Sequence, residues 1–431
     1  MNTLSNIESE VRSYSRSFPV VFDHAEGSYL SNINGTRYLD FLAGAGTLSY
    51  GHNNSVLAQA LIDYIQHKGI THGLDMSTRA KHEFLEAFQE LILLPRGLDY
   101  RVQFTGPTGT NAIEAALKIA RNVTGRSNVI AFTNGFHGVT LGALSATGNT
   151  HHRSAAGMSL SGITRMPFDG YLGADIDTST LLEKMLADKS SGVDLPAAVL
   201  LETVQGEGGL NVASEEWLTS IERICRRYDA LLIVDDIQAG CGRTGSFFSF
   251  EQMSIKPDIV TLSKALSGFG LPMAITLIDP KYDIWKPGEH NGTFRGNNHA
   301  FITATATLRE YWQDDTFVHD VRRKSDFLAE RLHEISQRYT KSIASARGRG
   351  MMRGVCCHHG DIASRIASRA FAKGLIIETS GAESEVVKCL CPLTITNIEL
   401  KEGLYILEES VREESIGRSF KATAEVVCKP I

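Results

Sequence analysis

The sequence predicts an α/β protein with a large domain on a mostly parallel sheet and a smaller α+β domain. From about residue 100, strand patterns alternate with helical patterns, which is the rhythm of a parallel sheet covered by helices. Several strand candidates are continuous apolar runs, as expected where helices cover both sheet faces. With 431 residues and 42% hydrophobic content, the chain can bury a large core.

The amino-terminal part is predicted to form a hairpin and then to become helical. Residues 29–33 and 36–40 would pair across Asn34-Gly35, a dipeptide that accepts the positive φ values of a type I′ turn. Helical periodicity begins at about residue 55. The large domain would then contain a helix at 111–122 and strands at 101–105, 128–133, 197–201, 231–234, 259–262 and 273–278.

The large domain is placed at residues 60–305. A long helical stretch after residue 300 leads into shorter strand candidates at 351–355 and 374–378, which indicate a second unit. Residues 1–59 and 306–431 are therefore predicted to form the small domain together, from both termini.

The composition indicates a protein that acts on small molecules. The net charge of −6 is spread along the chain, without a basic run that could follow a nucleic-acid backbone. No apolar run is long enough to cross a bilayer, and residues 1–10 carry acids instead of the apolar stretch of a signal peptide. Seven irregularly spaced cysteines favour reduced thiols. We therefore expect a cytoplasmic protein with no nucleic-acid or membrane partner.

The cluster Cys356-Cys357-His358-His359 gathers four potential metal ligands. If this segment is a strand, successive side chains point to opposite faces, and only alternate residues could share an ion. We therefore favour a partly buried strand and expect no metal site.

Two strand candidates end in groups that pyridoxal phosphate chemistry requires. The strand at 231–234 leads to Asp235 and Asp236, and the strand at 259–262 leads to Lys264. A lysine supplies the amine for a Schiff base, and a carboxylate can pair with the pyridinium nitrogen. Taken alone, paired acids more often form a solvated strand end, and a lysine is usually exposed.

A turn before the 111–122 helix is a candidate phosphate site. Residues 104–110 read Phe-Thr-Gly-Pro-Thr-Gly-Thr, and a glycine-rich turn at a helix start presents free N–H groups and the positive end of the dipole. Gly109 and Thr110 are the candidate ligands; the alternative is a turn and cap only. The same domain holds further residues that favour the pyridoxal-phosphate interpretation, namely Phe136, His137, Gly138, Asp235, Gln238 and Lys264.

Residues 240–245, Gly-Cys-Gly-Arg-Thr-Gly, match the dinucleotide-binding fingerprint letter for letter. That motif opens a helix directly at a strand end, whereas here five residues intervene and residues 246–250 lack helical periodicity. Nucleotide binding is therefore the weaker interpretation.

Residues 232–245 carry a family resemblance. They read Leu-Ile-Val-Asp-Asp-Ile-Gln-Ala-Gly-Cys-Gly-Arg-Thr-Gly, which resembles the pattern of the class III, or ω-amino-acid, aminotransferases, with conservative departures at Asp236 and Ile237. These are pyridoxal-phosphate enzymes of fold type I, and the resemblance extends over essentially the whole chain. Within the class, residues 11–19, 41–47, 69–75 and 285–297 look like the diaminobutyrate–2-oxoglutarate transaminases of ectoine biosynthesis.

The resemblance implies pyridoxal 5′-phosphate as the cofactor. Lys264 would form the Schiff base and then move the proton, while Asp235 would pair with the pyridinium nitrogen. The other implied cofactor-binding residues are Gly109 and Thr110 at the phosphate, Phe136 stacked on the ring, His137, Gln238 at the 3′ oxygen, and Thr293, which would come from a neighbouring subunit. A homodimer or higher homo-oligomer is therefore implied.

The substrate region departs from better-known relatives. Lys388 stands where relatives often have an arginine for the α-carboxylate, and Glu207 keeps the position of the mobile glutamate that pairs with it. A lysine retains the charge but loses the planar two-point grip. Val139 replaces an arginine that serves the distal carboxylate of 2-oxoglutarate in several relatives. We expect Arg295 to replace it; alternatively, Arg295 only supports the dimer interface.

The resemblance implies a reversible ping-pong transfer of the amino group of L-glutamate to L-aspartate 4-semialdehyde, giving L-2,4-diaminobutyrate and 2-oxoglutarate. Another ω-amine, such as ornithine or 4-aminobutyrate, is the main alternative, since one methylene changes specificity only about 10–200-fold. A non-catalytic cofactor-binding protein is the third possibility, because fold alone does not establish function. The presence of Lys264, Asp235 and Gln238 argues against it.

Overall fold

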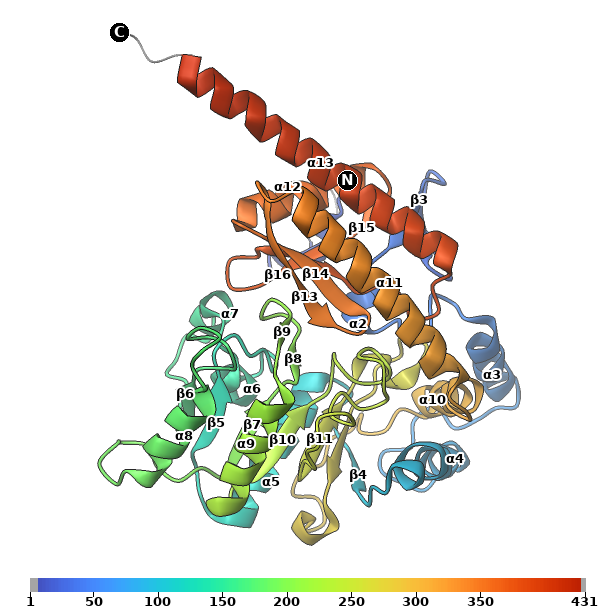
Figure 1. Ribbon diagram of the computed structural model, residues 1–431. Helices are drawn as coiled ribbons and strands as arrows, with labels where there is room; N and C mark the ends of the chain where they lie inside the picture. The colour runs from blue at the N-terminus through green and yellow to red at the C-terminus, as the bar shows by residue number, and fades with distance from the viewer. Residues whose placement is uncertain (1–6, 428–431) are drawn as a thin grey trace.

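The computed structural model of the protein describes residues 7–427 (Figure 1). Residues 1–6 of the amino-terminal segment considered above, and Cys428 near the other end, lie outside the described residues. Over the range 7–427, no helix has the length and apolar character needed to cross a membrane.

A seven-stranded sheet forms the centre of the larger part of the molecule. Its order is β4-β12-β11-β10-β7-β5-β6, and the strands from β11 to β6 all pair in parallel. Strand β12 is antiparallel to both neighbours, so the expected mostly parallel sheet is confirmed. The strands are β4 (Arg101–Phe104), β5 (Val129–Phe132), β6 (Ile163–Met166), β7 (Ala198–Leu201), β10 (Leu231–Asp235), β11 (Ile259–Leu262) and β12 (Ile275–Ile278).

Helices lie against this sheet and around it (Figure 1). The helix α5 (Gly109–Thr124) packs on β10, β11 and β12 through the apolar face that its sequence spacing predicts. The other helices are α1 (Tyr14–Ser17), α2 (Ala43–Gly46), α3 (Ser55–Gln66), α4 (Arg79–Phe88), α6 (Leu141–Ala146), α7 (Thr150–Ser154), α8 (Thr178–Ala187), α9 (Glu215–Arg227), α10 (Asn298–Tyr311), α11 (Thr316–Arg338), α12 (Gly360–Ala372) and α13 (Asn397–Val427). Short helical turns are η2 (Gln89–Leu93), η3 (Leu94–Arg96), η4 (Lys264–Ser267) and η5 (Pro280–Tyr282).

The predicted amino-terminal hairpin is present, but its predicted turn type is wrong. Strand β1 (Phe22–Glu26) pairs with β2 (Tyr29–Asn32), which pairs with β3 (Arg37–Asp40). Gly35 has a φ of 80°, whereas Asn34 does not adopt the positive φ that a type I′ turn requires. The Asn32 side-chain oxygen instead accepts hydrogen bonds from the backbone N–H groups of Asn34 and Thr36, both at 3.0 Å.

The predicted strand at 374–378 is divided between two sheets. Strand β15 (Leu375–Ile376) pairs in parallel with β3, while β16 (Glu378–Ser380) joins β13 (Ile343–Arg349), β14 (Met352–Cys357) and β17 (Val386–Cys389) in an antiparallel sheet. A small ribbon pairs β8 (Val204–Gln205) with β9 (Asn211–Val212). Cys356 and Cys357 are buried in β14 as strand residues. Among residues 7–427, no three His, Cys, Asp or Glu side chains gather as a metal site would require.

Residues 240–245 form a buried turn, not the start of a helix; the next regular element after β10 is β11. The Arg243 side chain is fully buried and donates hydrogen bonds to the carbonyl oxygens of Met351 and Cys391 and to Ser49 Oγ. This arginine therefore joins three distant segments of the chain, which gives the glycine-rich motif a structural role.

Candidate active site

The carboxyl ends of the parallel strands β10 and β11 bring Asp235 and Lys264 to one cavity. Asp235 is the last residue of β10, and Lys264 follows β11 after a single residue, Ser263. The cavity has a volume of about 160 Å³. It is lined by Gly109, Thr110, Phe136, His137, Gly138, Glu202, Glu207, Asp235, Ile237, Gln238 and Lys264.

The Asp235 carboxylate is held in place by three donors. His137 Nδ1 donates to Oδ2 at 2.7 Å, and Oδ1 accepts from the Ile237 N–H at 3.1 Å and from Thr261 Oγ1 at 3.4 Å. Burial favours the neutral imidazole, but the hydrogen bond and charge of Asp235 outweigh it and raise the pKa of His137. Both side chains are almost fully buried, so the orientation of this carboxylate in the cavity is fixed.

Lys264 occupies a backbone conformation that L-residues rarely adopt. Its φ is 49°, at the first position of the turn η4. Strained φ values of this kind persist where the surrounding structure imposes them, and they cluster at functional sites. Burial lowers the pKa of the Lys264 ammonium, which favours the neutral amine that a nucleophile requires.

The start of α5 has the features of an anion site. The Thr108 side chain does not cap this helix, and among residues 7–427 the N–H groups of Gly109 and Thr110 have no hydrogen-bond acceptor. Thr110 Oγ1 shares a hydrogen bond of 2.6 Å with Thr140 Oγ1, which also donates to Glu114 Oε1 at 2.6 Å. A Cβ on Gly138 would lie 2.4 Å from Thr110 Oγ1, so only glycine fits beside this hydroxyl.

Gln238 links the cavity to a glutamate. Its Nε2 donates to the Ala45 carbonyl oxygen at 3.1 Å and to Glu207 Oε1 at 3.0 Å. Its Oε1 is buried and has no hydrogen-bond partner among the described residues. A buried amide oxygen without a partner is costly, which indicates that a ligand contributes to this cavity.

Phe136 closes one side of the cavity. Its N–H donates to Glu202 Oε2 at 3.0 Å, and its ring lies 5.3 Å from that of His152 at an interplanar angle of 67°. Burial raises the pKa of Glu202 to about 7. Together, an amine, a fixed carboxylate, an uncapped helix start, an aromatic ring and an unsatisfied amide are the groups that could hold pyridoxal phosphate.

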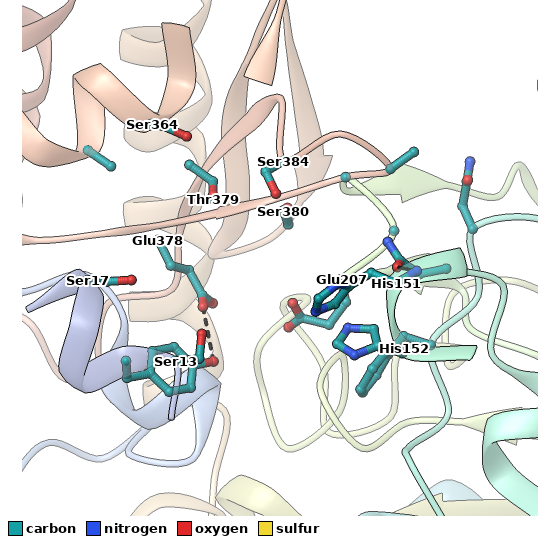
Figure 2. Close-up of a pocket in the computed structure, with 18 of the residues that line it drawn as sticks. Ser13, Ser17, His151, His152, Glu207, Ser364, Glu378, Thr379, Ser380 and Ser384 are labelled. Atoms are coloured by element: carbon teal, nitrogen blue, oxygen red, sulfur yellow. Dashed lines mark hydrogen bonds between the residues drawn. The ribbon is translucent and has the colours of Figure 1, made fainter. Parts of the chain in front are cut away.

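A larger pocket of about 760 Å³ adjoins this cavity and shares Phe136 and Glu207 with it (Figure 2). At the junction, the buried Lys388 Nζ lies 2.8 Å from Glu207 Oε1 and 3.0 Å from Glu378 Oε1. Tyr14 OH donates to Glu378 Oε2 at 3.3 Å. Of the substrate residues predicted from sequence, Glu207 and Lys388 are therefore brought together.

The two carboxylates beside Lys388 differ in their affinity for protons. Burial would raise the pKa of Glu207, but the charges of Lys388 and Lys264 outweigh it and lower this pKa to about 2. For Glu378, burial together with the charge of Glu207 outweighs Lys388 and raises the pKa.

Thr293 and Arg295 are not in the cavity formed by their own chain. Thr293 is exposed, and Arg295 Nη1 lies 3.3 Å from Asn291 Oδ1 and 4.0 Å from Asp75 Oδ2. Sequence reasoning missed Glu202, Tyr14 and Glu378. For Glu378, a signal was available, since a carboxylate at the end of the apolar run 375–377 repeats the pattern that marked Asp235.

Comparisons with known proteins cover nearly the whole chain. A family model described as aminotransferase class-III matches residues 11–411. The diaminobutyrate–2-oxoglutarate transaminase of Vibrio cholerae is 60% identical over 413 residues, which are 96% of this chain and 100% of the relative. The enzyme of the same name from Halomonas elongata is 59% identical over 413 residues, which are 95% and 98% of the two chains.

Solved structures show the same fold at lower identity. A Bacillus anthracis aminotransferase superposes with a TM-score of 0.84 at 23% identity, covering 96% of this chain and 100% of that one. The ornithine aminotransferase of Toxoplasma gondii superposes with a TM-score of 0.82 at 26% identity, covering 96% and 94%.

Proposed function

Since the chain belongs to the class III aminotransferases, we propose that it transfers the amino group of L-glutamate to L-aspartate 4-semialdehyde. The products would be L-2,4-diaminobutyrate and 2-oxoglutarate, by a reversible ping-pong sequence. The observation that carries this substrate pair is the near full-length identity, 60% in one case and 53% in another, to enzymes named diaminobutyrate–2-oxoglutarate transaminase. Enzymes of this class depend on pyridoxal phosphate, and the cavity residues fit that cofactor.

Each cavity residue has a role in this proposal. Lys264 would anchor the cofactor through its amine and, once released, would move a proton at the carbon that bears the reacting amine. Asp235 would keep the ring nitrogen protonated, and His137 orients this carboxylate. When bound, the cofactor supplies an electron sink for the carbon that loses its proton.

The remaining contacts orient the cofactor and exclude water. Gly109 and Thr110 would hold the phosphate at the start of α5, where backbone N–H groups and the helix dipole favour an anion. Phe136 would stack on the ring and Gln238 would bond the 3′ oxygen, and both residues line the cavity. The lowered pKa of Lys264 leaves a larger neutral fraction of this amine at a given pH, as proton abstraction requires.

The proposed active unit is a homodimer. Thr293 would complete the phosphate site of the neighbouring subunit, and Arg295 would receive the distal carboxylate of 2-oxoglutarate there. The exposure of Thr293, and the position of both residues outside their own cavity, support this assignment. A cytoplasmic location is part of the proposal; the buried reduced thiols of Cys225, Cys241 and Cys389 support it, and cell fractionation would test it.

The experiment is a half-reaction on purified protein loaded with pyridoxal phosphate. L-2,4-Diaminobutyrate, ornithine and 4-aminobutyrate are added separately, and the absorbance of the bound cofactor is followed. Rapid bleaching by diaminobutyrate alone is expected. Preference for another ω-amine would overturn the substrate and keep the transaminase, whereas retained turnover in Lys264→Ala would overturn the mechanism.

A further inference from the structure

The cluster of Lys388, Glu207 and Glu378 lies where the outer pocket meets the cofactor cavity. Glu207 lines both spaces, and Glu378 lines the outer pocket. Figure 2 shows the two carboxylates in this pocket, with His151 and His152 beside Glu207. The Lys388 side chain is completely buried, so its charge must be balanced locally.

The charge of Glu378 is the least compensated in this cluster. Lys388 is shared with Glu207, and burial together with the charge of Glu207 outweighs the opposing charges of Lys388 and Lys264 and raises the pKa of Glu378. The other donors, Tyr14 OH to Glu378 and Gln238 Nε2 to Glu207, are neutral. A buried carboxylate whose ionised form is not fully compensated is stabilised when a further cation approaches it. The pocket therefore favours a ligand with a positive group at this point.

Of the two carboxylates, Glu378 is the one that can bind the positively charged group of a ligand. Its Oε1 is buried and lacks a hydrogen bond among residues 7–427, although Lys388 Nζ is 3.0 Å away. Glu207 Oε1, by contrast, already accepts from both Lys388 and Gln238. Glu378 also begins β16, whose pairing with β17 fixes its backbone. Its position is therefore set before a ligand binds.

Glu378 also reduces the net positive charge that Lys388 can offer to a substrate carboxylate. If Glu207 moved out of contact, Lys388 would still be neutralised by Glu378 at 3.0 Å. A lysine already paired with a buried carboxylate offers little net charge to a substrate carboxylate. The cluster as a whole is therefore better suited to an ammonium than to a carboxylate.

We propose that Glu378 is a specificity-determining residue that binds the α-ammonium group of the ω-amine substrate. This inference rests on the proposed function. When the 4-amino group of L-2,4-diaminobutyrate reacts, its α-carbon still carries an ammonium and a carboxylate. 4-Aminobutyrate is the same molecule without that ammonium, so the carboxylate of Glu378 selects against it.

A matched pair of unreactive ligands tests this assignment by binding alone. L-Homoserine and 4-hydroxybutyrate carry a hydroxyl in place of the reacting group and differ only in the α-ammonium. Protein loaded with pyridoxamine phosphate has no carbonyl to react with either, and calorimetry gives both dissociation constants. The titration is done at mildly alkaline pH, because the pKa of Glu378 is raised and a higher pH increases its ionised fraction.

The wild-type protein should prefer L-homoserine by about tenfold or more, as expected for a charge-assisted hydrogen bond. Glu378→Gln should abolish this preference, and Tyr14→Phe, which removes the hydrogen bond to Glu378, should reduce it. Glu383→Gln is the control, because it removes an exposed carboxylate five residues further along the chain. Equal binding of both ligands by wild type, or an unchanged preference in Glu378→Gln, would overturn the proposal.

A kinetic comparison separates this proposal from the function on which it rests. The ratio of kcat/KM for diaminobutyrate to that for 4-aminobutyrate should fall about tenfold or more in Glu378→Gln. If the wild-type protein converts diaminobutyrate rapidly but does not prefer L-homoserine over 4-hydroxybutyrate, only the proposed role of Glu378 is refuted. If wild type does not convert diaminobutyrate, the proposed function fails, whatever the binding result.

Discussion

His137 Nδ1 donates a 2.7 Å hydrogen bond to Asp235 Oδ2 at the floor of the cofactor cavity. Because both groups are buried, the bond fixes the direction of the carboxylate and favours the protonated imidazole, in line with the raised pKa of His137. The imidazole can therefore hold the Asp235 carboxylate in place from within the cavity that both residues line.

Replacing His137 with alanine should weaken cofactor binding by about tenfold or more, because Asp235 loses a charge-assisted donor and its fixed orientation. Fluorescence titration of cofactor-free protein with pyridoxal phosphate would measure the dissociation constant. His151→Ala serves as the control, since His151 lines only the outer pocket. Equal loss of affinity in both variants would contradict the role of His137.

Covalent capture of pyridoxal phosphate should depend on the titration of Lys264. The neutral amine attacks the carbonyl, so the capture rate should rise with pH through the pKa of Lys264 and level off above it. Burial lowers this pKa, so the midpoint should fall below the ordinary lysine value of about 10.4. Borohydride trapping followed by mass spectrometry measures the rate.

Charged groups around Lys264 should move this midpoint in a defined direction. Glu207, Glu378 and Asp235 raise the pKa of Lys264, whereas Lys388 lowers it. Glu207→Gln should therefore shift the midpoint of capture to lower pH. A midpoint at the ordinary value in wild type, or an upward shift in the variant, would contradict this account.

Gly138→Ala should reduce cofactor affinity because the new Cβ would lie 2.4 Å from Thr110 Oγ1 at the proposed phosphate site. Gly173→Ala is a matched control. Gly173 has a φ of 109°, close to the 121° of Gly138, but an added Cβ meets nothing within 4 Å. The control should therefore lose about 1 kcal/mol of stability from backbone strain and keep its affinity. Parallel loss of affinity in both variants would assign the effect to backbone strain.

Arg243→Ala should lower the free energy of unfolding by about 3 kcal/mol, because three buried acceptors lose their donor. Arg323→Ala, which removes an arginine that is 77% exposed, should change it by no more than about 0.5 kcal/mol. Urea denaturation of the cofactor-loaded protein would measure both. A loss below about 1 kcal/mol for Arg243→Ala would show that water satisfies these acceptors.

Mixed oligomers would test the proposed contribution of Thr293 to a neighbouring site. Lys264→Ala and Thr293→Ala proteins should each have low activity. After they are unfolded together and refolded, a mixed dimer has one site with both defects and one intact site, so activity should recover. No recovery, despite mixed dimers detected by mass spectrometry, would place Thr293 in the site of its own chain.

The positions of Asp235 and Lys264 are predictable from sequence because buried parallel strands are continuous apolar runs whose ends meet at one sheet edge. The conformation of Lys264 is not predictable in this way. Its positive φ is imposed by the turn η4 after β11, and residue type alone disfavours it.

Two other features depend on contacts between distant segments. Tyr14 and Glu378 come from opposite ends of the chain, so the local sequence pattern around either residue does not predict their hydrogen bond. The strand predicted at 374–378 contains one apolar run, 375–377, yet Leu375 and Ile376 pair with β3 whereas Glu378 pairs with β17. The turn type at Asn34 was predicted wrongly because a side chain outside the dipeptide, that of Asn32, bonds the backbone there.

The pairing of β3 with β15 has a consequence for synthesis of the chain. Strand β3 ends at Asp40, but its parallel partner begins only at Leu375, so one edge of β3 stays open until nearly the whole polypeptide has left the ribosome. The apolar side chains of Phe18 and Tyr38, which pack with Ile376, remain uncovered for the same interval. An open strand edge beside apolar side chains is prone to association. We therefore expect nascent chains of this protein to be prone to association at their first hairpin until translation is almost complete.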